Sequence, residues 1–127
     1  MILYIDTTKN NSVEIGIKDK NKFVCKNKFS SERTQAEKLL PNIAKMLKSA
    51  KLKLSDLKGI EVANQGGSFT SLRIGVITAN ALGYALAIPV SGEKGETKKV
   101  KNGKLSFNIV KPEYDSEPII TVKKKKN

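Results

Sequence analysis

The sequence predicts an α/β domain, and three observations lead to that prediction. The first thirty residues hold three short segments that are apolar or alternate in polarity, as the strands of a meander do. Two longer segments later in the chain carry apolar residues at helical spacing. A short apolar run lies between them, and its place after a helix predicts a strand parallel to the first. With 127 residues, the chain has the length of one domain.

The three opening strands are expected at residues 2–5, 12–19 and 23–29. The first is an apolar run that the turn-rich cluster DTTKNN closes. In the second, Val13 and Ile15 alternate with polar or small residues, which is typical of a half-buried strand. The short connections favour antiparallel pairing of all three strands.

A helix is expected over residues 34–50, where apolar side chains recur at helical spacing. Thr34 and Glu37 form a capping box that could start this helix. Pro41 conflicts with a regular helix because proline has no N–H to donate, so we expect a kink there or a later start. A loop then leads to the parallel strand at residues 59–64.

The second helix follows the stretch NQGGSFTSLRIG, ends before Pro89, and is followed by a short fifth strand in IPVSG. Gly75, Ala79 and Gly83 stand four residues apart in it, so one stripe of the helix carries almost no side chain. Each interior glycine costs roughly 1 kcal/mol relative to alanine, which indicates that another element approaches closely. That element is either the chain's own sheet or first helix, or another protein.

The last part of the chain is more basic, because residues 94–127 contain ten lysines and four acidic residues. Asn102-Gly103 predicts a hairpin turn. We divide the chain into a first domain at 1–92, a basic β-hairpin extension at 93–111 and an extended, partly disordered basic tail at 112–127. The order β-β-β-α-β-α-β before the hairpin is that of a ribonuclease H-like domain, the building block of the actin-like ATPases (ASKHA fold).

Composition excludes several function classes. The chain has no histidine, which removes imidazole metal sites and the Ser-His and Cys-His nucleophile pairs. The single cysteine, Cys25, cannot form an internal disulfide and fits a reducing, cytoplasmic compartment. Neither a signal peptide nor a membrane span is expected from the apolar runs. The net charge of +12 favours polyanion partners, unless the lysines serve only solubility.

Two places could carry chemistry. Asp6 ends the first strand, where ribonuclease H-like nucleases and actin-like ATPases place a metal-binding acid. Only Glu61 is a candidate to join it, and a metal pair needs more carboxylates, so we interpret Asp6 as a solvated strand-end acid. A small ribonuclease H-like nucleotide-binding or hydrolytic enzyme that uses Asp6 is the alternative function. The glycine pair is either a structural turn or a phosphate contact, formed by Gly66, Gly67, Ser68 and Arg73.

Four segments occur in order within residues 1–92: ILYIDTT, RTQAEKLLPNI, GSFTSLRIG and ALGYALAIPVSG. They resemble the patterns ILAIDTS, HSExLLP, GPGSFTGLRIG and GLAxxxxIPxxG of the bacterial TsaB (YeaZ) family. The string GSFTxLRIG is the specific part of this resemblance. The later stretch PEYDSEPIIT also looks like the family's C-terminal PxYxREPxIT.

The resemblance implies a non-catalytic protein of the pathway that makes N6-threonylcarbamoyladenosine (t6A) on tRNA. It implies no catalytic residue, metal or cofactor. It also implies a heterodimer with a TsaD-like protein, which a TsaE-like ATPase joins. The family's interface helices correspond to residues 34–50 and 69–86, where the expected partner contacts are Leu39, Leu40, Ile43, Leu72, Gly75, Val76, Ala79 and Gly83.

The sequence departs from the family pattern in several places. Gln35 and Ala36 replace a His-Ser pair, and Gln65 and Ser71 stand where the family has glycine. The family's second domain is missing, so we expect a shortened member. The basic hairpin and tail are then candidates for a tRNA contact that salt would weaken. Self-association through the same helices is a further possibility.

Overall fold

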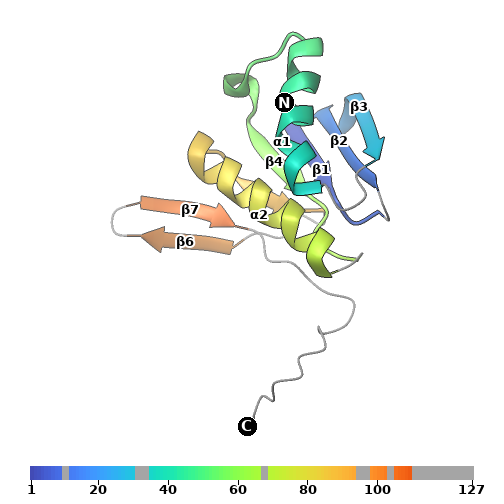
Figure 1. The fold of residues 1–127 in the computed structure, drawn as a ribbon. Coiled ribbons are helices and arrows are strands. Elements are labelled where there is room, and N and C mark those ends of the chain that lie inside the picture. Colours follow the sequence, from blue (N-terminus) through green and yellow to red (C-terminus); the bar gives the residue numbers. More distant parts are fainter. Residues whose placement is uncertain (10–11, 31–34, 67–68, 94–97, 103–104, 110–127) are drawn as a thin grey trace, which may run out of the picture.

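A mixed five-stranded sheet in the order β3-β2-β1-β4-β5 forms the centre of the computed structural model (Figure 1). The structure describes residues 1–9, 12–30, 35–66, 69–93, 98–102 and 105–109. The first three strands pair antiparallel, and β4 and β5 continue the sheet in parallel, which confirms the predicted meander and parallel fourth strand. The strands are β1 (Ile2–Asp6), β2 (Ser12–Asp19), β3 (Lys22–Ser30), β4 (Gly59–Val62) and β5 (Val90–Gly92).

Two helices, α1 (Gln35–Ser49) and α2 (Phe69–Leu86), lie on one face of this sheet (Figure 1). The first helix begins one residue after Thr34, which lies outside the described residues, and it continues through Pro41. A short 3₁₀ helix (Leu54–Asp56) follows α1. Within the described ranges, no helix combines the length and the hydropathy that crossing a bilayer requires.

The core forms between the helices and one face of the sheet, because residues alternate between the two faces of a strand. Leu3 and Ile5 of β1 face the helices and are fully buried, as are Val13, Ile15 and Ile17 of β2. Burial of one such aliphatic side chain stabilises the fold by about 1.5–3 kcal/mol. The helices and later strands complete the core with Leu39, Ile43, Met46, Leu47, Leu57, Ile60, Val62, Leu72, Val76, Ala79 and Val90.

The small-residue stripe of α2 faces this core. A Cβ atom on Gly75 would lie 2.5 Å from Oγ1 of Thr7, and one on Gly83 would overlap Cγ2 of Val90. Ala79 is fully buried between them. The stripe therefore lets α2 approach β1 and β5 closely, which corrects the expectation that its three residues contact a partner.

Both helices end with a residue in the left-handed region. Lys51 has φ 58° and Ala87 has φ 56°. In each case the next amide reaches back to the last turn: Leu52 N donates to Leu47 O at 2.9 Å, and Ile88 N donates to Gly83 O at 3.0 Å. These bonds satisfy terminal carbonyls and turn the chain back towards the sheet.

The opposite face of the sheet carries charged and aromatic side chains that pair with one another. Nζ of Lys18 lies 2.9 Å from Oε2 of Glu61 and about 5 Å above the rings of both Tyr4 and Phe23. The two rings meet edge to face, with centroids 5.3 Å apart. Tyr4 is 7% exposed, and its hydroxyl donates to Asp6. Burial raises the pKa of Tyr4 well above its ordinary value, and the carboxylate of Asp6 raises it further.

Beyond β5, two strands pair antiparallel: β6 (Lys98–Asn102) and β7 (Leu105–Ile109). Strand β7 lies beside α2 and β5 (Figure 1). The predicted turn at Gly103 and the predicted tail at 112–127 lie outside the described residues. The division of the chain into three parts stays a prediction.

Two substitutions on one helix test which side of α2 packs on the sheet. Ala79→Leu should lower the free energy of unfolding by about 1–3 kcal/mol, because a larger side chain overfills a fully buried position. Ala81→Leu should change it by less than about 0.5 kcal/mol, because Ala81 is exposed. Urea denaturation of both variants measures the difference, and equal stabilities would contradict this orientation of the helix.

The titration of Tyr4 tests the burial of the polar face. The unfolded chain loses the phenol proton near pH 10 and the folded chain only at higher pH. The stability contributed by the neutral phenol is therefore complete below about pH 10 and is lost as the pH rises further. The difference in absorbance at 295 nm between the wild type and Tyr4→Phe should stay flat through pH 10 while circular dichroism shows a folded chain. Ionisation of Tyr4 near pH 10 in the folded protein would contradict the prediction.

Candidate functional site

The corner between β1 and α2 contains the glycine-rich motif, and its contacts are structural. The hydroxyl of Thr7, at the end of β1, donates to the carbonyl oxygen of Ser71 in the first turn of α2. Gly75, one turn further on, leaves room for the same threonine. Gly66 has φ 86°, a conformation that favours glycine. The motif thus holds the start of α2 against β1.

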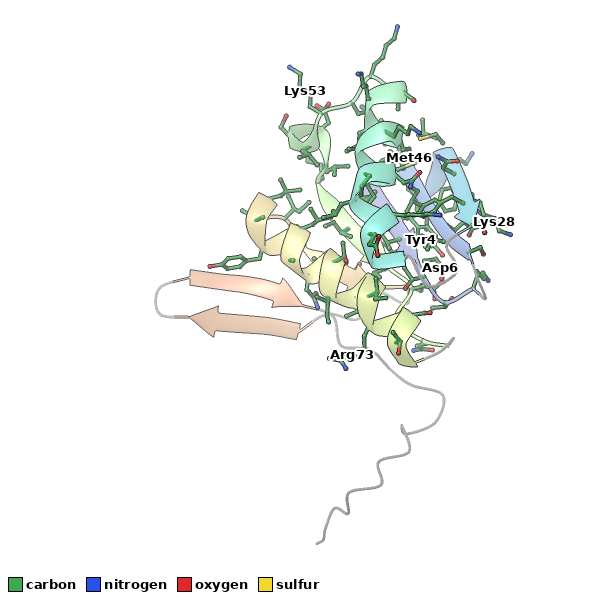
Figure 2. The ribbon with its side chains drawn as sticks, viewed as in Figure 1. Tyr4, Asp6, Lys28, Met46, Lys53 and Arg73 are labelled. Carbon is green, nitrogen blue, oxygen red and sulfur yellow. The ribbon has the colours of Figure 1, made fainter. Side chains whose placement is uncertain are left out.

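The predicted phosphate contact receives no support from these contacts. Gly66 serves the left-handed turn, whereas Gly67 and Ser68 lie outside the described residues. Arg73 lies on the exposed side of α2 and points away from the body of the domain (Figure 2). Phosphate binding at this corner stays a prediction.

Asp6 is buried, with 3% of its surface exposed, which corrects the interpretation that it is a solvated strand-end acid. Its Oδ1 accepts bonds from the backbone N of Thr8, at 2.8 Å, and from the hydroxyl of Thr8. Its Oδ2 accepts the hydroxyl of Tyr4 at 3.4 Å (Figure 2). Three donors from the same strand end therefore compensate the cost of burying the carboxylate.

Other carboxylates influence this region. Partial burial raises the pKa of Glu93, and the carboxylates of Asp6 and Glu61 raise it further. Glu14, on the neighbouring strand, lies 3.7 Å from Nζ of Lys26. Within the described residues, no three His, Cys, Asp or Glu side chains are grouped so that they could hold a metal ion.

The outer side of the two helices exposes large apolar side chains, as the edge strand β3 also does with Phe23 and Val24. Leu40 of α1 is 50% exposed, and Ile77 and Tyr84 of α2 are 57% and 50% exposed. Ile77 and Tyr84 lie seven residues apart, which places them on the same side of α2. This side is turned roughly 80–140° around the helix from Leu72 and Val76, which are buried. We call Leu40, Ile77 and Tyr84 the outer apolar surface.

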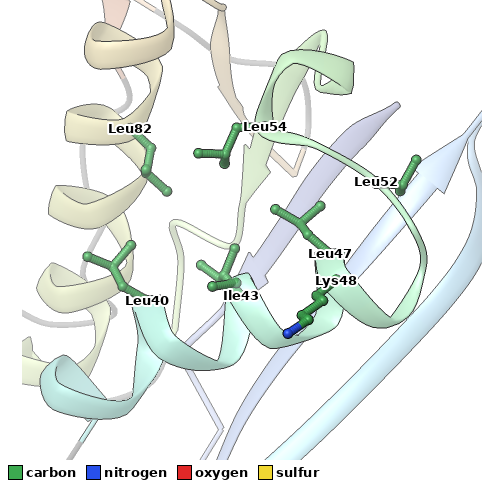
Figure 3. A pocket seen from close by; sticks show the side chains of 8 residues that line it. Leu40, Ile43, Leu47, Lys48, Leu52, Leu54 and Leu82 are labelled. Atoms are coloured by element: carbon green, nitrogen blue, oxygen red, sulfur yellow. The ribbon is translucent and has the colours of Figure 1, made fainter.

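A groove lies next to Leu40, between α1, the 3₁₀ helix and α2 (Figure 3). It has a volume of about 450 Å³, and leucine side chains from all three elements form its walls. Its lining residues are Leu40, Ile43, Ala44, Leu47, Lys48, Leu52, Leu54 and Leu82. An apolar side chain or segment of another molecule fits the chemistry of these walls.

The structure separates the eight predicted interface residues into two groups. Leu40 is exposed, and Ile43, although only 2% exposed, lines the groove. The other six are buried in the core of the chain, which corrects their assignment to direct partner contact: Leu39, Leu72, Gly75, Val76, Ala79 and Gly83.

Sequence reasoning missed Ile77 and Tyr84 as contact candidates. Their signal was the helical period, because both fall outside the buried side of α2 that Leu72 and Val76 mark. The role of the outer apolar surface as an interface stays a prediction.

Comparisons with known proteins identify the family. A family model described as "TsaD: tRNA N6-adenosine threonylcarbamoyltransferase" matches residues 29–94, just over half of the chain. The tRNA threonylcarbamoyladenosine biosynthesis protein TsaB of Bacillus subtilis is 27% identical over 115 residues, which cover 91% of this chain and 50% of that protein. An uncharacterized protein of Mycobacterium tuberculosis is 45% identical over 60 residues, which cover 47% of this chain and 28% of that protein.

A solved structure supports the fold. The crystal structure of an uncharacterized Pseudomonas aeruginosa protein with similarity to peptidase YeaZ superposes with a TM-score of 0.66 and 25% identity. The match covers 72% of this chain and 41% of that one, so the chain spans half or less of the length of these relatives. The predicted ribonuclease H-like, actin-like fold is thereby confirmed. The chain belongs to the family that this TsaD model describes, and within it the chain is TsaB/YeaZ-like.

Proposed function

We propose that this chain is a non-catalytic subunit that binds a TsaD-like protein in the t6A modification of tRNA. One observation carries the proposal: Leu40, Ile77 and Tyr84 expose large apolar side chains on the outer side of both helices. An exposed apolar patch on a folded domain is typical of a site where another protein binds. The groove offers room for partner side chains between Leu40 of α1 and Leu82, which lies on the other side of α2 from Ile77 and Tyr84.

The rest of the described surface favours the helices over the sheet as the contact site. On the sheet face, Lys18 pairs with Glu61 and covers the rings of Tyr4 and Phe23. A partner at this face would have to displace those contacts or leave charges desolvated. At the outer apolar surface a partner removes apolar area from water, which is favourable without such a loss.

The family supports the biological setting of the proposal. The Bacillus subtilis relative is named for tRNA threonylcarbamoyladenosine biosynthesis, and the matching family model is named for the transferase TsaD. We propose by analogy that the chain acts beside such a transferase and has no catalytic role of its own. A TsaE-like ATPase and tRNA are further proposed members of the assembly.

An enzyme that uses Asp6 has less support. The carboxylate is buried and already accepts bonds from Thr8 and Tyr4. A role as a base or metal ligand would require these bonds to rearrange.

A matched pair of substitutions tests the proposed interface. Ile77→Glu should weaken the complex with the TsaD-like protein of the same genome by about tenfold or more, because it places a charge within an apolar contact. Val24→Glu is the control, because Val24 is 56% exposed, close to the 57% of Ile77, but lies on the edge strand β3. Size-exclusion chromatography with light scattering measures both complexes, with circular dichroism to verify folding.

A 1:1 complex that survives Val24→Glu but not Ile77→Glu is the expected result. A wild-type chain that forms no complex would overturn the proposed function. Equal effects of the two substitutions would place the interface elsewhere on the molecule.

A further inference from the structure

We infer that the groove receives an apolar segment of the partner that carries carboxylates beside its apolar side chains. The inference rests on the proposed function and adds the chemistry of the segment that docks. The size of the groove, the residues of its walls and the charge at its rim each contribute to the argument.

The groove is large enough for several side chains. Its volume of about 450 Å³ falls within the roughly 300–1,000 Å³ of pockets that hold drug-sized molecules. Seven of its eight lining residues are apolar, and the leucines come from α1, the 3₁₀ helix with its preceding loop, and α2 (Figure 3). The walls therefore favour apolar groups of a bound segment. They do not determine the charge of the residues next to those groups.

The eighth lining residue, Lys48, supplies a charge at the rim (Figure 3). A second hollow of about 270 Å³ adjoins the groove and shares Ala44 and Lys48 with it. Pro41, Asn42 and Lys45 complete the lining of this hollow. The lining of each hollow thus includes at least one lysine, and neither lining contains a carboxylate.

The loop after α1 carries two further lysines next to a residue of the groove wall. Leu52 and Leu54 form part of the wall, and the exposed residues Lys51 and Lys53 flank Leu52 in the chain. Figure 2 shows Lys53 on the same side of the molecule as the 3₁₀ helix. The only acidic residue of that short helix, Asp56, accepts a bond from the backbone N of Lys53 at 2.8 Å.

This charge distribution distinguishes between occupants. A partner segment without carboxylates would cover the lysine rim and remove water from it without replacing the lost solvation. A second copy of this chain, related by a two-fold axis, would bring the same lysine rim against itself. A partner with carboxylates next to its apolar side chains instead complements both parts of the surface. The groove therefore favours an acidic segment of a different protein over self-association.

Charge changes at Lys48 test the inference. The probe is the TsaD-like protein of the same genome, and its affinity for the full chain is measured by biolayer interferometry at low and high salt. Lys48→Glu should weaken binding about tenfold, and Lys48→Gln should weaken it less, because one reverses the charge and the other removes it. Added salt should weaken the wild-type complex and reduce the difference between wild type and Lys48→Glu.

Lys20→Glu is the control, because Lys20 is an exposed lysine in the turn between β2 and β3, away from the groove. It makes the same change in net charge and should leave the affinity unchanged. A complex with the wild type that is indifferent to Lys48→Glu and to salt would overturn the inference and leave the proposed function standing. Equal losses for Lys20→Glu and Lys48→Glu would also overturn it, because the effect would then follow net charge. A wild type that binds no TsaD-like protein would overturn both proposals.

Discussion

The close approach of α2 to β1 and β5 is the constraint on which the rest of the structure depends. It requires Gly75 against Thr7 and Gly83 against Val90, because a side chain at either glycine would collide with a β-branched residue, just after β1 or within β5. Two interior glycines cost the helix roughly 2 kcal/mol in propensity, which the packing against the sheet has to offset. At the glycine-rich corner before α2, the hydroxyl of Thr7 donates to the carbonyl oxygen of Ser71. This hydrogen bond holds the start of the helix against the end of β1.

The orientation of α2 decides which residues remain for other molecules. With Leu72, Val76 and Ala79 turned to the sheet, the helical period turns Ile77 and Tyr84 outwards. The other face of the sheet ends in a layer of paired charges and aromatic rings, with Lys18 at its centre. The helical side exposes Leu40, Ile77 and Tyr84 and so offers apolar area for association.

Much of the fold could be predicted from the sequence, because its patterns are local. The alternation in residues 12–19 and the helical spacing in α1 predict elements that the structure contains. The sequence could not show what packs against the small-residue stripe. Close approach of the chain's own sheet and close approach of a second protein both require small residues at these positions. The burial of Asp6 was also missed, since Tyr4 and Thr8 reach it only once the strand end turns back on itself. The exposure of Ile77 and Tyr84 could have been predicted, because the helical period places both outside the buried side of α2.

The most direct measurement of the central claim is the labelling of a thiol on the outer apolar surface. With Cys25 replaced by serine, Ile77→Cys provides a single reactive site whose maleimide labelling rate can be followed with and without the TsaD-like protein. We predict that the partner slows labelling at residue 77 several-fold and leaves the rate of a matched Val24→Cys variant unchanged. Unchanged labelling at residue 77 in a complex that forms would contradict the claim that the outer side of α2 is the interface.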